Sequence, residues 1–199
     1  MIYFTADWHL YHKNIIRYCN RPFKTVKAMH SRLFSEFNTK VSPNDETYHI
    51  GDFTMAGSSH KEKLKNTIRK MNGVHHLILG NHDEMKPFHY IDIGFTSVHT
   101  SFPLQYDFEE RVFDFILNHD PSVYCMLRED QYLLHGHIHT IYKHLLPARR
   151  IINVGVDVWD FKPVSIEDIC RLIVKEEENG RVYNELEEAG IERLLKEKK

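Results

Sequence analysis

The hydrophobic positions of this chain form short apolar runs, typical of buried strands, which alternate at first with stretches of helical periodicity. Apolar runs at 2–6, 47–50 and 76–79 predict the first strands. Between them, Thr25 is the expected cap of a helix with apolar positions at 26, 29, 33, 37 and 41. Ser59 and Glu62 predict a capping box for a second helix.

The second half of the chain is richer in strands. Apolar runs predict them at 97–102, 112–117, 131–136 and 150–156, followed by a helix from Ser165 to about Val174. Alternating strands and helices, followed by a series of strands, favour a layered α/β fold around a mixed sheet. We expect one domain over 1–174 and a charged helical tail over 175–199, either part of that domain or appended to it.

The composition does not change the expected fold, but it argues against some classes of function. The chain has 199 residues, 42% hydrophobic and 27% charged, which is ordinary for a globular protein. A net charge of −2 argues against duplex nucleic acid as an obligate partner. The widely spaced cysteines form no CxxC pair, and no long apolar run or signal peptide is present. We therefore expect a cytoplasmic protein without a membrane segment.

Polar side chains follow five of the apolar runs, each at the carboxyl end. They are Asp7 and His9, then Asp52, then Asn81, His82 and Asp83, then His119, and finally His137 and His139. In α/β folds, ligand sites form outside the carboxyl ends of strands, where several loops meet. Glycines at 51, 80 and 136 allow tight turns there. A coincidental histidine face of one strand does not explain all five runs.

Metal-ligating residue types make up most of this set. The candidate ligands are Asp7, His9, Asp52, Asn81, His119, His137 and His139. They are too many for one zinc ion and suit two divalent ions that share a carboxylate. Oxygen and imidazole ligands without a thiolate favour manganese, with iron, zinc, nickel or cobalt as alternatives. Such paired ions serve in-line displacement at phosphorus.

In this order, D-x-H (7–9), G-D (51–52), G-N-H-D (80–83), His119 and G-H-x-H (136–139) resemble the calcineurin-like metallophosphoesterase superfamily. The resemblance covers residues 1 to about 165 and is best to a compact bacterial and phage subgroup. It implies an α/β fold of the four-layer α-β-β-α sandwich type with mixed sheets. It also implies that Asp7, His9, Asp52 and His139 hold one metal, and that Asp52, Asn81, His119 and His137 hold the other.

The resemblance further implies a reaction. A metal-bridging hydroxide attacks phosphorus, and His82 protonates the leaving oxygen as general acid. Asp83 either orients the His82 ring or is a turn residue. The sequence FTMAG after Asp52 lacks the GDxVDRG pattern of phosphoprotein phosphatases, which argues against that class. We expect a metal-dependent phosphoric ester hydrolase, a phosphodiesterase rather than a phosphomonoesterase, with a nucleotide as one candidate substrate. The alternatives are a non-catalytic scaffold that binds a partner protein, and a nuclease on single-stranded or structured nucleic acid.

Other residues near the motifs allow more than one interpretation. His12, Asn14 and Arg17 are candidate substrate contacts just beyond the first motif, whereas Arg17 and Arg21 also suit surface charge. Five further residues, next to the motifs or at another strand end, are candidates for supporting or packing roles. Asn153 and Asp157 are expected to support the site, His135 to be structural, and Trp8 and Trp159 to pack in the core or stack on a base.

Overall fold

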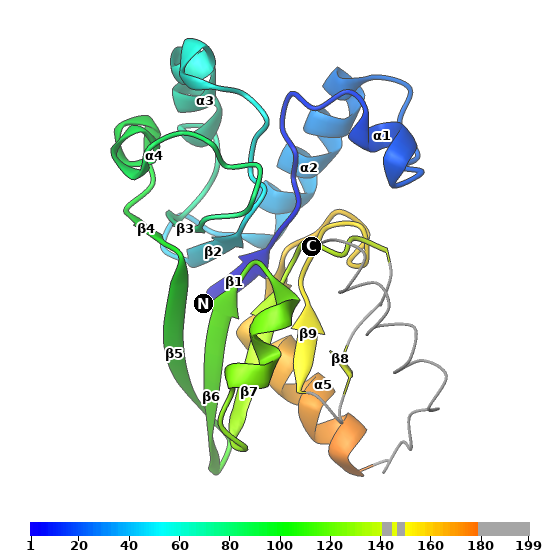
Figure 1. Cartoon of the computed structure of the whole chain (residues 1–199), viewed down its shortest axis with the longest axis vertical. Coiled ribbons are helices and arrows are strands. Elements are labelled where there is room, and N and C mark those ends of the chain that lie inside the picture. Colours follow the sequence, from blue (N-terminus) through cyan, green and yellow to red (C-terminus); the bar gives the residue numbers. More distant parts are fainter. Residues whose placement is uncertain (141–144, 147–149, 179–199) are drawn as a thin grey trace.

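The computed structural model describes residues 1–140, 145–146 and 150–178, and it has a mixed α/β fold built on two five-stranded sheets (Figure 1). The first sheet has the strand order β10-β1-β2-β3-β4. Its strands are β10 (Val164–Ser165), β1 (Ile2–Thr5), β2 (Glu46–Ile50), β3 (Val74–Ile78) and β4 (Ser97–His99). Strands β1 to β4 are parallel, and β10 pairs antiparallel with β1 at the edge.

The second sheet has the order β5-β6-β7-β9-β8. Its strands are β5 (Ser101–Phe108), β6 (Arg111–Asn118), β7 (Gln131–His135), β9 (Ile151–Asn153) and β8 (Leu145–Leu146). The central strands β6, β7 and β9 are parallel, while β5 and β8 close the two edges in antiparallel pairing. The expectation of an α/β fold with mixed sheets is therefore confirmed.

Helices connect the parallel strands of the first sheet. They are α1 (Ile15–Tyr18), α2 (Val26–Lys40), α3 (Lys61–Ile68) and α4 (Pro87–Ile93), with α5 (Ile166–Glu178) after β10 and 3-10 turns at Ser58–His60 and Pro121–Met126. As expected, the Thr25 hydroxyl caps α2, because it accepts a hydrogen bond from the Ala28 amide at 3.1 Å. Among the described residues, no helix is both long and apolar enough to cross a bilayer.

Two large hydrophobic clusters hold these elements together. The first joins α2, α3 and α4 to the first sheet through residues such as Phe37, Leu64, Tyr90 and Leu77. The second joins both sheets and α5, with Phe4 and Ile78 from one sheet and Phe115 and Ile152 from the other. Burying each such side chain contributes about 1.5–3 kcal/mol, so the two sheets are fixed relative to each other. The loops beyond the strand ends are therefore held on a rigid base.

Three elements differ from the sequence-based predictions. The strand expected over 97–102 is two strands, because the chain leaves the first sheet after β4 and enters the second with β5. The expected capping box is wrong, since the Ser59 hydroxyl lies 3.1 Å from Nδ1 of His60 and α3 begins after a 3-10 turn.

Helix α5 also runs past Val174 to Glu178. Glu177 near its end accepts a hydrogen bond from Nη1 of Arg111 at 2.6 Å and one from the Tyr132 hydroxyl. These contacts tie the helix to β6 and β7. The rest of the expected tail, 179–199, lies outside the described residues.

Candidate metal centre

The candidate ligands gather where the parallel strands of both sheets end. Beyond β1, the Ala6 carbonyl accepts a hydrogen bond from the Val156 amide at 3.1 Å, which joins the two sheets at this edge. Asp7, His9 and His139 each offer a ligand atom within 4.8 Å of the others, and so do Asp7, Asp52 and His119. The expected convergence of loops is therefore present in the fold.

Asp52 lies between the two expected halves of the site. Its Oδ2 atom is 3.4 Å from Nε2 of His9 and 3.4 Å from Nε2 of His119. On the far side of His119, Oδ1 of Asn81 lies 3.2 Å from the same Nε2 and 2.9 Å from Nδ1 of His137. One carboxylate oxygen thus has a histidine of each expected half of the site beside it.

Five of the candidate ligands share a left-handed backbone conformation. The angle φ is positive at five of them, namely Asp7 (59°), His9 (49°), Asp52 (52°), His137 (74°) and His139 (50°). Residues other than glycine rarely adopt this left-handed region, and such residues cluster at functional sites, where packing over-determines the strain. These turns direct the side chains toward the site, and packing of the surrounding fold offsets the backbone strain.

Two glycines permit the close approach of these loops. A Cβ atom on Gly80 would overlap the amide nitrogen and a carboxylate oxygen of Asp52, and one on Gly51 would overlap the ring of His119. Gly51 also has a φ of +82°. Gly80 of the GNHD motif is therefore required by space, and Gly51 of the GD motif by both space and backbone conformation.

Hydrogen bonds on the outer ring nitrogens orient the histidines. Nδ1 of His119 lies 2.9 Å from the Ile50 carbonyl and donates to it, which leaves Nε2 facing Asp52 and available to a metal. Nε2 of His9 is buried without a hydrogen-bond partner among the described residues. An orphaned buried nitrogen costs about 1–3 kcal/mol, and a cation would satisfy it. This nitrogen and the oxygen and imidazole donors around it fit two divalent ions.

The charges of the buried carboxylates and histidines are strongly coupled at this site. Burial raises the pKa of Asp7 above its ordinary value. Burial acts against ionisation of Asp52 too, but the hydrogen bond and charge of His119 outweigh it and lower the pKa of that carboxyl. Burial lowers the pKa of His119, but Asp52 and Asp7 raise it by more, so that the net pKa lies above the ordinary value, at about 9. The Asp52 carboxylate and the His119 imidazolium thus stabilise each other's charge at this site.

Arg21 and Asp157 contact the candidate ligands Asp7 and His139 by hydrogen bonds. Arg21 is buried, and its Nε and Nη2 atoms donate to the two carboxylate oxygens of Asp157 at 2.7 and 2.8 Å. Its Nη2 atom also donates to the Asp7 carbonyl at 2.6 Å. Arg21 is therefore not a surface charge, which corrects one of the sequence-based interpretations. The support expected from Asp157 is present, and the Asn153 side chain donates to the His139 carbonyl at 2.8 Å.

Asp83 holds two loops together. It is buried, its Oδ1 accepts a hydrogen bond from the Phe53 amide at 3.0 Å, and its Oδ2 accepts one from the Gly80 amide at 2.9 Å. Burial raises the pKa of Asp83 to about 7 despite these bonds. Both carboxylate oxygens are thus engaged by backbone, and the structure does not support the catalytic assignment of Asp83. Of the two interpretations left open, the structural one fits.

A cavity of about 390 Å³ opens beside the ligands. Its lining residues are His9, His12, His82, His139, Ile15, Tyr18, Cys19, Ile138 and Thr140. The His82 ring centroid lies 5.4 Å from that of His9, and the His82 amide donates to Oδ1 of Asp52 at 2.9 Å. His82 is thus held beside the candidate centre, with its ring facing the cavity. Cys19, Tyr18 and Ile138 are lining residues that the motifs did not indicate.

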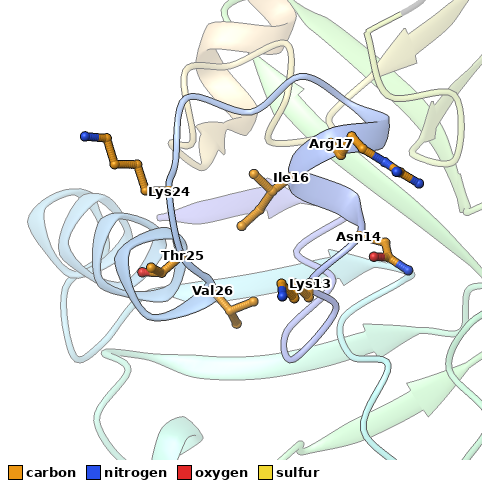
Figure 2. A pocket seen from close by; sticks show the side chains of 7 residues that line it. All are labelled: Lys13, Asn14, Ile16, Arg17, Lys24, Thr25 and Val26. Carbon is orange, nitrogen blue, oxygen red and sulfur yellow. The ribbon is translucent and has the colours of Figure 1, made fainter.

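The expected substrate contacts divide between two places. His12 lines this cavity, whereas Asn14 and Arg17 line a second one, whose lining residues Figure 2 shows. Trp8 is buried among aromatic rings, so it packs in the core, and Nε1 of Trp159 donates to the Asn153 carbonyl at 2.7 Å. His135 is buried and bonded to the Gly136 carbonyl, in agreement with a structural role.

Comparisons with known proteins give relatives without assigned activities. No family model matches the chain. It is 34% identical to the uncharacterized protein MJ1445 of Methanocaldococcus jannaschii, over 87% of this chain and 92% of that protein. It is 27% identical to the Gene 66 protein of Mycobacterium phage L5, over 88% and 96% of the two chains. The crystal structure of a protein of unknown function, AQ665 from Aquifex aeolicus, matches with a TM-score of 0.65 and 26% identity, over 87% and 99% of the two chains.

Proposed function

This chain belongs to the family of the uncharacterized Methanocaldococcus protein, and from the chemistry of its own site we propose that it is a binuclear metal-dependent phosphodiesterase. The observation that carries the proposal is the place of Asp52, whose Oδ2 atom lies 3.4 Å from a histidine of each half of the site. A shared carboxylate between two nitrogen- and oxygen-rich half-sites is the arrangement that two adjacent divalent ions require.

Each half of the site has its own ligands. Asp7, His9, Asp52 and His139 would hold one ion, and Asp52, Asn81, His119 and His137 the other. Manganese suits these donors best, with iron, zinc, nickel or cobalt as alternatives. When bound, the ions supply Lewis-acid polarisation of the phosphoryl oxygen and lower the pKa of water.

His82 is the proposed proton donor. Its ring lines the cavity, and its amide bond to Asp52 fixes its distance from the ligands. Among the described residues, none makes a hydrogen bond to the His82 ring, which therefore remains available to a substrate oxygen in the cavity. A histidine there can protonate the leaving oxygen of an ester as the bond to phosphorus breaks. Asp83 acts on this step only by holding the loop that carries His82.

The cavity favours a diester over a monoester. No lysine or arginine stands among the described residues that line it, and Ile15, Tyr18 and Ile138 form an apolar side. A monoester dianion requires more positive charge than a diester, which carries one negative charge. The apolar wall also suits the second ester group of a diester.

Two further points belong to the proposal. We assign the fold to the four-layer α-β-β-α type, supported by helices α2 to α4 on the first sheet and by the hydrophobic cluster that joins both sheets. We assign the protein to the cytoplasm, because Cys19, Cys125 and Cys170 are all free thiols, as in a reducing compartment.

The test is hydrolysis of bis-p-nitrophenyl phosphate and of p-nitrophenyl phosphate by protein stripped of metal and reloaded with manganese. We expect release of nitrophenol only with metal, and faster from the diester. Faster release from the monoester would overturn the diester assignment. Absence of release from both, with two ions bound, would overturn the enzymatic one.

A further inference from the structure

The segment before and along α1 and α2 is basic in a chain that is slightly acidic overall. Residues 8–35 contain no Asp or Glu but carry Lys13, Arg17, Arg21, Lys24, Lys27 and Arg32. Arg21 is buried with Asp157, and Arg32 pairs with Glu36 at 3.1 Å. Within the described part of the chain, no ion pair involves the other four. Their charge is thus open to an external anion.

Three of these cations surround a cavity of about 510 Å³ between α1 and the start of α2. Ile16 and Val26 lie between the two helices, while Lys24 and Arg17 extend on opposite sides of them (Figure 2). Lys13, Asn14 and Thr25 complete the lining. The lining therefore joins two apolar side chains between the helices, called the apolar floor below, to three positively charged ones.

Helix α1 separates this cavity from the candidate metal centre. Ile15 and Tyr18 line the cavity beside the metal ligands, and Ile16 and Arg17 line the basic one. Tyr18 is 63% exposed, and the Arg17 guanidinium carbon lies 5.4 Å from the centre of the Tyr18 ring. An exposed aromatic ring at the cavity beside the candidate centre thus lies next to a guanidinium of the basic cavity.

We propose that α1 and the basic cavity form a subsite for single-stranded nucleic acid. This inference rests on the proposed function. One phosphodiester of the strand lies at the metal centre, a neighbouring base stacks on Tyr18, and adjacent phosphates lie at Lys13, Arg17 and Lys24. The apolar floor of Ile16 and Val26 accepts the face of a base.

The chemistry of the two cavities favours this ligand over others. Proteins bind single strands with cationic grooves and aromatic platforms, because every base has a flat apolar face. A free phosphate would use the cations but not the apolar floor or Tyr18. Duplex nucleic acid suits the chain less well, because the charge is confined to one short segment and the net charge is −2.

Binding of a fluorescent oligodeoxythymidylate to the full chain tests the subsite. The variant Lys13→Gln/Arg17→Gln/Lys24→Gln should weaken binding by at least about ten-fold at low salt. It should also make the salt dependence of binding less steep, by about 0.7 for each phosphate that the variant no longer neutralises. The control variant Lys63→Gln/Arg69→Gln/Lys70→Gln removes the same charges from α3 and the turn after it and should change affinity by less than about two-fold. Equal weakening in both variants would overturn the proposal.

Tyr18 gives a second readout that does not depend on charge. Tyr18→Ala should weaken oligonucleotide binding on the order of ten-fold, and Tyr18→Phe should restore it, because phenylalanine keeps the stacking face. Weak binding by Tyr18→Phe as well would contradict stacking. Turnover of bis-p-nitrophenyl phosphate by the unmodified chain separates the two proposals. Turnover without oligonucleotide binding overturns the subsite alone, and oligonucleotide binding without turnover overturns the phosphodiesterase alone.

Discussion

Nδ1 of His139 lies 2.8 Å from Oδ2 of Asp157, a carboxylate that is itself bound by Arg21. The three residues come from three separate loops. Burial acts against the charge on the Asp157 carboxyl, but the bonds from His139 and Arg21 outweigh it and lower its pKa below the ordinary value. The charged carboxylate holds the imidazole with Nδ1 outward, which leaves its other nitrogen for a metal and makes it a stronger ligand.

Replacing this carboxylate should weaken metal binding. We expect Asp157→Asn to lower the affinity for manganese by roughly 10- to 100-fold, because the amide cannot draw the Nδ1 proton of His139 in the same way. Competition with a fluorescent chelator measures the affinity. Asp160→Asn, in the same loop but exposed and paired only at the surface, is the control. Equal affinities of the two variants would show that Asp157 does not support the centre.

The close approach of two loops at Gly80 gives a steric prediction. Gly80→Ala places a methyl group against the amide and carboxylate of Asp52, so we expect loss of metal binding and of turnover. Gly57→Ala is the matched control, since nothing lies within 4 Å of the added methyl group. Metal titration and circular dichroism of both variants separate loss of the centre from unfolding. A Gly80→Ala protein that binds metal normally would contradict the geometry of the site.

His82 allows metal binding and chemistry to be separated. In His82→Ala we expect both metal ions to bind as before, because the contact of residue 82 with Asp52 is made by its backbone amide. Turnover of a diester should fall about 10²- to 10⁴-fold, which is the usual contribution of a general acid. A diester with a very acidic leaving group should be affected less, since its oxygen needs no proton. Equal decreases with good and poor leaving groups would rule out the proton-donor role.

The sequence was sufficient to predict that the candidate ligands lie close together, because of a simple geometric rule. Asp7, Asp52 and Asn81 follow neighbouring parallel strands, and such strand ends meet at one edge of a sheet. His119 and His137 follow the same rule in the second sheet. A residue that directly follows a parallel strand is therefore predicted to lie at the edge of the sheet where the other such residues lie.

The supporting contacts could not be predicted in this way. Arg21 and Asp157 are 136 positions apart in two irregular loops, and no periodicity relates them. Asp83 follows its strand like a ligand, yet its carboxylate turns back to the amides of Phe53 and Gly80. The sequence predicted one strand at 97–102 where the structure has two. The chain changes sheet there, and this change depends on tertiary packing and leaves no signal in local hydrophobicity.

A buried histidine pair predicts loss of stability in acid. Nε2 of His49 lies 3.4 Å from Nδ1 of His75 in the core under α2, and burial lowers the pKa of His75 to about 4. The unfolded chain takes up a proton at His75 below about pH 6.5, whereas the folded chain does so only below about pH 4. The free energy of unfolding should therefore decrease as the pH falls between these values, by up to roughly 3 kcal/mol for this residue.

Thermal unfolding of the metal-free chain between pH 7 and pH 4 measures this effect. In His75→Phe, which keeps an aromatic ring next to Phe37 and Phe95, we expect the melting temperature to depend less on pH. His60→Phe, at the half-buried end of a 3-10 turn, serves as the control. An unchanged pH dependence in His75→Phe would assign the acid sensitivity to other groups.

The central claim is that two metal ions act together around Asp52. The most direct measurement follows turnover of bis-p-nitrophenyl phosphate as manganese is added in steps to metal-free protein, with bound metal determined at each step. We predict two bound ions per chain at saturation and turnover that rises mainly with the second. Full turnover with one bound ion, or none with two, would contradict this claim.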